Sequence, residues 1–214
     1  MNRVLLGVVV AAAAVGAGCA TVERSRALDN PAVPARTIAL QVCSNCHGVT
    51  GHSESPNFPN LAGQTEPYLA AQLKSFRSHQ RADPAGFEYM WGLTRHLTDA
   101  QIDGLAAYYA AQKPAANPPG DTALAAAGKE IVEKGVPAGS VPACESCHGT
   151  NGEGKETFPR LADQHGDYLV KQLKVFQWTD ERPEGSVMKG VAHGLTATQM
   201  TQVAAYLQSV PTGR

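Results

Sequence analysis

The stretch CSNCHG, Cys43 to Gly48, and its near copy CESCHG, Cys144 to Gly149, decide the architecture of this chain. Each places two thiols and an imidazole within five residues, and the sequence that follows one copy is repeated after the other. NFPNLAGQTEPYLAAQLKSF (57–76) matches TFPRLADQHGDYLVKQLKVF (157–176) at an offset of 100, and MWGLTRHLTDAQIDGLAAYYAAQ (90–112) matches MKGVAHGLTATQMTQVAAYLQSV (188–210) at an offset of 98. The chain is therefore a tandem duplication of one small unit.

Helical patterning dominates each unit. Apolar residues recur at helical spacing over 68–76 and 168–176, and strand alternation is not evident. The last helix of each unit should begin at a capping box, Thr98 to Gln101 and Thr196 to Gln199. A helix is also expected ahead of each cysteine motif, more clearly at 123–134 than at 36–42. These patterns predict an all-α fold.

The boundaries follow from the repeat and from one proline-rich stretch. KPAANPPGD, residues 113–121, breaks any helix that would cross it and should act as a short, partly stiff linker. We expect a first domain at 33–112 and a second domain at 122–212.

The first residues, MNRVLLGVVVAAAAVGAGCA, are expected to be a secretory signal covering residues 1–18, with Arg3 before an apolar run and small residues after it. That run is shorter than the roughly 18 residues that span a membrane. The chain has five cysteines, and Cys19 is the one that lies outside the two motifs. The segment ending in Cys19 resembles the lipobox of bacterial lipoproteins. Lipid attachment at Cys19, and through it membrane association, is the expectation, with ordinary cleavage near Ala17 or Ala20 as the alternative.

Composition narrows the class of protein. The net charge is −1, only 17% of residues are charged, and no basic run is long enough to suggest a nucleic-acid surface. Aromatic residues make up only 6% of the chain. Small domains with so few large apolar side chains often include a metal or cofactor in their interior.

Four kinds of chemistry could use two thiols followed by a histidine. A zinc site built from both motifs would need them about 15 to 20 residues apart, and a redox dithiol expects a strand–helix–strand setting. A disulfide within each motif would leave the histidines without a role. Covalent attachment of haem c uses every group, since the thiols add to the porphyrin vinyl groups and the histidine ligates the iron. We expect two haem c groups, on Cys43, Cys46 and His47 and on Cys144, Cys147 and His148, with zinc or a redox dithiol as the alternatives.

The sixth iron ligand should be a methionine in each half. Met90 and Met188 occupy equivalent places, each 18 residues before a tyrosine of the last helix, in stretches with little regular patterning that predict loops. Met200 falls on the apolar stripe of that helix and should be core. The remaining histidines, His52, His79, His96, His165 and His193, are expected at the surface or around the sites. Ligation by two histidines in one half is the alternative.

The order of CxxCH, FPxLA, YLxxQLxxF, a methionine segment and a capped final helix resembles cytochrome c4, a bacterial dihaem protein of two fused class I cytochrome c domains. The resemblance covers 43–210. It implies two His/Met-ligated haems and electron transfer to respiratory oxidases. We therefore expect an electron carrier of the bacterial periplasm, not an enzyme, with a quinol–cytochrome c reductase complex and a terminal oxidase as partners.

Individual roles also follow from this resemblance. It implies that the carbonyls of Pro59 and Pro159 accept hydrogen bonds from the two ligating histidines. It places Arg81 and Arg182 near the haem propionates, with solvated surface arginines as the alternative.

Two other functions remain open at this point. One is an electron-transfer subunit of a dehydrogenase or oxidase complex. The other is a dihaem enzyme of the peroxidase or thiosulfate-oxidising type with one open haem, against which the equal spacing of Met90 and Met188 argues. Trp91 and Trp178 are expected to be packing residues.

Overall fold

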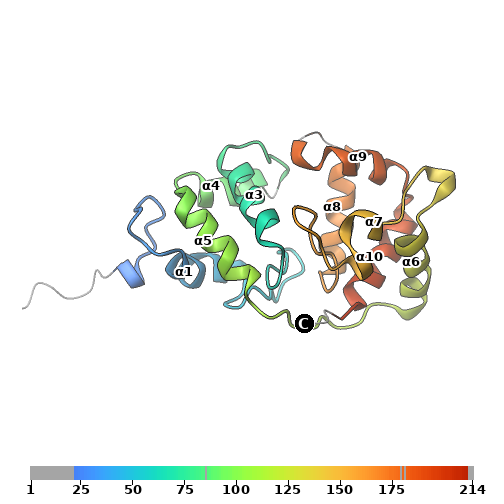
Figure 1. The fold of residues 1–214 in the computed structure, drawn as a ribbon, viewed down its shortest axis with the longest axis horizontal. Helices are drawn as coiled ribbons and strands as arrows, with labels where there is room; N and C mark the ends of the chain where they lie inside the picture. Colours follow the sequence, from blue (N-terminus) through green and yellow to red (C-terminus); the bar gives the residue numbers. More distant parts are fainter. Residues whose placement is uncertain (1–21, 85, 179, 181, 212–214) are drawn as a thin grey trace, which may run out of the picture.

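The computed structural model describes residues 22–211 except 85, 179 and 181. Figure 1 shows two helical domains side by side, with the linker running along one edge between them. The described residues contain no named strand, only the isolated bridges Val136–Val141 and Lys155–Phe158. The all-α prediction is confirmed. The expected signal and Cys19 lie outside the described residues.

The first domain has three main helices and several short turns. A 3-10 turn at Val22–Arg24 precedes α1 (Ala35–Ile38), a π-helical turn (Ala39–Cys43), α2 (Ser44–His47), α3 (Glu66–Arg77), a second π-helical turn (Gly86–Met90), α4 (Trp91–Thr94) and α5 (Asp99–Ala110). Helix α1, the first π-helical turn and α2 follow one another without a break, so a helix leads directly into the cysteine motif. Of the two helices expected ahead of the cysteine motifs, this one is continuous with its motif, although its sequence pattern is the weaker.

The second domain repeats this order with longer first and fourth helices. Its elements are α6 (Thr122–Lys134), α7 (Glu145–His148), α8 (Gly166–Trp178), α9 (Ser186–His193) and α10 (Ala197–Ser209), with 3-10 turns at Pro137–Gly139, Thr150–Gly152 and Pro183–Gly185. Helix α6 ends before the motif because Gly135, at φ 75°, turns the chain into a short hairpin closed by Val136 and Val141. The helix expected here is confirmed, but it does not run into the cysteines.

Each domain has a hydrophobic core of its own. The first consists of Val33, Ile38, Ala39, Leu69, Leu97, Ile102, Leu105, Ala106 and Tyr109. The second consists of Ile131, Val132, Val141, Leu169, Leu195, Met200, Val203, Ala204 and Leu207. Met200, at 1% exposure, is core as predicted. Both capping boxes form as predicted, at Thr98 and at Thr196.

Close helix crossings replace some of the missing large side chains. Helices α6 and α10 touch at Gly128, where an added Cβ would lie 1.9 Å from the carbonyl oxygen of Gln202. In the first domain the small residue is on the other helix: a Cβ on Gly104 of α5 would lie 2.7 Å from the Cβ of Ala35 in α1. One glycine per crossing therefore lets the first and last helices of each domain approach closely.

Across the described part of the chain, no helix has the length and apolar character needed to cross a membrane.

Candidate functional site

Each cysteine motif forms one tight helical turn. Cys43 is the residue before α2 and Cys144 the residue before α7, so two sulfurs and one imidazole project from a single turn. The glycine after the histidine ends the turn with a positive φ, 74° at Gly48 and 80° at Gly149. A Cβ at Gly48 would lie 2.1 Å from the carbonyl oxygen of His52, so the glycine is required for the chain to turn away here.

None of the motif cysteines is paired in a disulfide. All four are partly buried, and burial raises the pKa of Cys43 to about 11 and that of Cys144 to about 11. The described residues also contain no group of three or more His, Cys, Asp and Glu side chains that could hold a metal ion, so the two motifs do not combine into one zinc site.

The motif histidines are buried, neutral and fixed in one tautomer. His47 is 7% exposed and His148 is 6% exposed, and burial lowers the pKa of each. The Nδ1 of His47 lies 3.0 Å from the carbonyl oxygen of Pro59, and the Nδ1 of His148 lies 2.9 Å from that of Pro159. A carbonyl can only accept, so Nδ1 carries the proton and Nε2 keeps a lone pair for a metal. The contact implied by the resemblance is present in both halves.

In the first domain an aromatic bridge connects the histidine to the methionine segment. The ring of Phe58 packs edge-on to His47, with 6.1 Å between centroids, and to Tyr89, with 6.4 Å. Met90 follows Tyr89 at the end of the π-helical turn, and its carbonyl accepts from Thr94 Oγ1 at 2.8 Å. The structure therefore places the segment of Met90 close to the cysteine motif.

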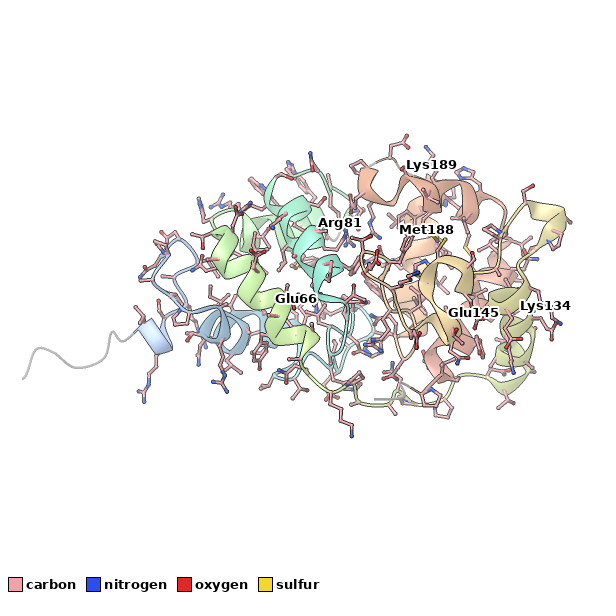
Figure 2. All side chains as sticks on the ribbon, in the orientation of Figure 1. Glu66, Arg81, Lys134, Glu145, Met188 and Lys189 are labelled. Atoms are coloured by element: carbon pink, nitrogen blue, oxygen red, sulfur yellow. The ribbon has the colours of Figure 1, made fainter. Side chains whose placement is uncertain are left out.

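In the second domain the methionine lies in a helix. Met188 is part of α9 (Figure 2). Gln177 of α8 anchors this helix and the residues after it by donating to the carbonyls of Ala192 at 2.6 Å and Leu195 at 3.1 Å. The prediction of an irregular loop is wrong here, and in part at Met90, because segments this short contain too few apolar residues to reveal a helical period.

Comparison with known proteins places these sites in a family. The cytochrome c family model matches residues 32–112 and 125–211. Cytochrome c-552 of Acidithiobacillus ferridurans is 40% identical over 88% of this chain and 82% of its own length. Cytochrome c4 of Azotobacter vinelandii is 35% identical over 79% of this chain and 84% of its own length. The solved structure of Acidithiobacillus ferrooxidans cytochrome c4 superimposes with a TM-score of 0.71 at 41% identity, covering 78% of this chain and 98% of that one.

The chain belongs to the cytochrome c4 family. It is a dihaem electron carrier rather than an enzyme, it carries haem c in each domain, and redox proteins are its partners.

The residues present fit this cofactor. Exposed apolar side chains flank the sites, among them Val49, Phe87, Tyr89, Phe158 and Val187, and such a surface suits a large flat apolar group. At the domain boundary the Nε of Arg182 and the Nε2 of Gln172 are buried donors without a hydrogen-bond partner. Buried donors of this kind suit the carboxylate ends of the same group.

Two glutamines at equivalent positions hold the domains of this cytochrome together. Gln164 Oε1 accepts from the backbone N–H of Asn60 at 2.8 Å, and Gln164 Nε2 donates to the Asn60 carbonyl at 3.0 Å. Gln64 does the same with the backbone of Arg160, at 2.6 and 2.9 Å. In each domain, therefore, a glutamine side chain satisfies the buried backbone N–H and carbonyl of one residue of the other domain.

A second set of contacts repeats this two-fold pattern with arginines. Arg81 Nη1 donates to Gln72 of its own domain, and Nη2 donates to Gln172 of the other domain at 3.3 Å. Arg182 Nη1 donates to Gln172, and Nη2 donates to Gln72 at 3.2 Å. Figure 2 shows Arg81 at the boundary between the domains.

These arginines are buried, at 4% and 6% exposure, so the alternative of solvated surface arginines is wrong. Their carboxylate partners differ: Asp83 lies 2.9 Å from Arg81 and is fully buried, whereas Glu184 lies 3.8 Å from Arg182 and is partly exposed. The interface thus holds two buried guanidinium groups, and the charge of Arg81 is balanced by a closer and more deeply buried carboxylate than the charge of Arg182.

The linker is fixed to this interface. The Asn117 backbone N–H donates to Asp163 Oδ1 at 2.7 Å, and Asn117 Nδ2 donates to the Asp163 carbonyl at 2.8 Å. The same carbonyl accepts from Asn60 Nδ2 at 3.1 Å, so one residue binds both linker and first domain. Burial raises the pKa of Asp163.

The other histidines are distributed broadly as predicted. His79, His96 and His193 are exposed, while His52 and His165 are half-buried at the domain boundary, with 6.2 Å between ring centroids. Trp91 packs against a neighbouring ring as expected. Trp178 is 85% exposed, so its assignment as a packing residue is wrong: α8 ends with this side chain pointing away from the core.

Sequence reasoning missed the interface residues Asn60, Gln64, Arg160 and Gln164. A signal was present, since a glutamine follows the repeated Leu-Ala pair in both halves, at Gln64 and Gln164.

Proposed function

We propose that this cytochrome carries electrons through a bacterial periplasmic respiratory chain, between a quinol–cytochrome c reductase complex and a terminal oxidase. Its haems are held by Cys43, Cys46, Cys144 and Cys147, with His47 and His148 as proximal ligands and Met90 and Met188 as sixth ligands. The observation that carries this assignment is the buried, neutral imidazole in each domain, whose Nδ1–H is bound to a proline carbonyl.

The bound haem supplies a one-electron Fe(III)/Fe(II) couple, and the protein determines its accessibility and potential. Each proline carbonyl orients its imidazole and makes the ring a stronger donor toward iron. A thioether ligand, supplied by Met90 or Met188, would favour the ferrous state and would leave no open position for a small molecule. Fixed protein ligands of this kind suit outer-sphere electron transfer and not substrate chemistry.

The interface suits exchange of electrons between the domains. The paired amides of Gln64 and Gln164 and the shared arginines fix one relative orientation. A fixed orientation keeps the separation of the two cofactors constant, so the rate of exchange between them does not depend on domain motion.

Export and tethering complete the proposal. We assign residues 1–18 to a secretory signal and Cys19 to lipid attachment, which would hold the carrier at a membrane surface. The boundaries 33–112, 113–121 and 122–212 are retained for the first domain, the linker and the second domain.

Carbon monoxide binding to the reduced holoprotein tests the ligation. The wild type should bind no carbon monoxide rapidly, since both sixth positions are filled. Met90→Ala and Met188→Ala should each open one haem, so each variant should bind one equivalent, and the double variant two. Fast binding by the wild type would overturn His/Met ligation in that half, and pyridine haemochrome analysis controls for two attached haems.

A second candidate is the electron-accepting partner of a thiosulfate dehydrogenase. It is supported by a relative from Thiomonas intermedia (strain K12) named thiosulfate dehydrogenase electron acceptor, 36% identical over 79% of this chain. Stopped-flow reduction by thiosulfate dehydrogenase and thiosulfate, against reduction by a quinol–cytochrome c reductase complex, separates the candidates: the physiological donor should reduce the haems much faster.

A further inference from the structure

A strained histidine ends helix α3 in the first domain. His79 has φ of 61°, in the left-handed region where glycine is usual and side chains are rare. Its N–H donates to the Phe76 carbonyl at 3.0 Å, and the next N–H, of Gln80, donates to the Ser75 carbonyl at 3.0 Å. Glycine would adopt this turn with less strain, so the turn does not require an imidazole, and any functional role of His79 lies in the contacts of its ring.

The His79 ring is the centre of an aromatic stack. It packs on Phe87, with 5.4 Å between centroids and 28° between planes, and on Trp91, with 5.0 Å and 30°. The guanidinium of Arg95 lies 5.4 Å from the Trp91 ring and extends the stack. Phe87, Trp91 and Arg95 recur every fourth residue and therefore share one side of the turn that contains Met90.

We propose that His79 positions Met90 as the sixth ligand of the first haem, an inference that rests on the proposed ligation by Met90. Phe87 and Trp91 lie on either side of Met90 in the sequence, and His79, which follows α3, holds both of their rings. Phe87 is 58% exposed, so the stack is not ordinary core packing. These contacts of His79 with Phe87 and Trp91, here called the clamp, restrain the turn that contains Met90. Without them, thermal motion of the turn would move the thioether away from the iron.

The second domain holds its methionine differently. Lys189 and His193 stand at the positions equivalent to Trp91 and Arg95, so this side of the segment carries no Phe–Trp pair. Met188 lies instead in the longer helix α9, anchored to α8 by Gln177. The residue aligned with His79 lies outside the described residues. The second haem therefore serves as an internal control.

Two substitutions at His79 distinguish the contribution of its ring from that of the backbone turn. His79→Asn removes the ring but keeps a residue that tolerates positive φ, and His79→Tyr keeps an aromatic ring. In the ferric holoprotein, imidazole competes with the thioether, and loss of the far-red thioether-to-iron absorption band measures the competition. His79→Asn should raise imidazole affinity about tenfold at one haem, the scale expected for loss of two ring stacks. His79→Tyr should restore most of the wild-type affinity, and Phe87→Leu should act in the same direction as His79→Asn.

Each outcome decides the matter. Unchanged imidazole affinity in His79→Asn, while Met90→Ala removes half of the absorption band, would overturn the positioning role and leave the ligation intact. An equal rise at both haems would also overturn it, because that would be general destabilisation. If Met90→Ala leaves the band unchanged, the ligation assignment itself fails, and the clamp with it.

Discussion

Replacing one interface glutamine should show how strongly the two domains stabilise each other. In Gln164→Ala the backbone N–H and carbonyl of Asn60 lose partners at 2.8 and 3.0 Å, in a place where Asn60 is only 3% exposed. A lost hydrogen bond that leaves a buried group unpaired costs about 1 to 3 kcal/mol, so two such groups should cost about 2 to 4 kcal/mol after partial relaxation. Gln64→Ala removes the equivalent pair on Arg160 and should cost a similar amount.

Denaturant unfolding of the holoprotein, followed by haem absorption and by tyrosine and tryptophan fluorescence, measures this change. The wild type should unfold in one transition, because unfolding of either domain leaves buried backbone groups of the other without hydrogen-bond partners. The double variant Gln64→Ala/Gln164→Ala should show two transitions and faster proteolysis of the linker. The combined loss should be smaller than the sum of the single losses, because an interface already opened cannot be lost again.

Gln80→Ala provides the control, since Gln80 is exposed and lies on the same domain. It should change the free energy of unfolding by less than about 0.5 kcal/mol. An equally small effect in Gln164→Ala would refute the argument, because it would mean that water reaches the Asn60 peptide or that the domains separate in solution.

Two further perturbations follow from the same structure. Gly128→Ala should destabilise the second domain by about 1 to 3 kcal/mol, because its Cβ would lie 1.9 Å from the Gln202 carbonyl oxygen. Gly104→Ala should cost less, because its Cβ would meet one methyl carbon, of Ala35, at the longer distance of 2.7 Å. Midpoints of denaturant unfolding compare the two variants. Burial lowers the pKa of His165, whose Nε2 lies 3.0 Å from the Ser53 carbonyl, so the folded state binds this proton less readily than the unfolded chain. Its contribution to stability is present above the ordinary histidine pKa of about 6.5 and falls as the pH decreases toward the folded pKa. His165→Gln should flatten that part of the stability profile, measured as the difference from wild type between about pH 7.5 and pH 5.5.

The controls for these two variants are internal. A Gly128→Ala protein that is less affected than Gly104→Ala would contradict the close approach of backbones in the second domain. A wild type whose stability did not fall relative to His165→Gln on acidification would contradict the burial of this imidazole against the first domain.

The sequence alone determined what depends on neighbours along the chain. The repeat gave the two domains, the capping boxes at Thr98 and Thr196 placed the final helices, and the spacing of the cysteine motif identified the cofactor. The apolar stripe of the last helix identified Met200 as core. These features are local, since a helical period, a cap or a thiol pair is complete within a few residues.

The tertiary structure decided what depends on residues about 100 positions apart. Whether Arg81 lies in solvent or between two domains, and whether Gln164 completes the peptide of Asn60, depends on how two separately folded units pack together. The helical state of Met188 and the exposure of Trp178 were likewise invisible to periodicity, because a short helix and a terminal side chain take their environment from neighbouring elements. Packing between elements depends on their shape and on the pairing of buried polar groups, and neither can be recognised from a periodic pattern in the sequence.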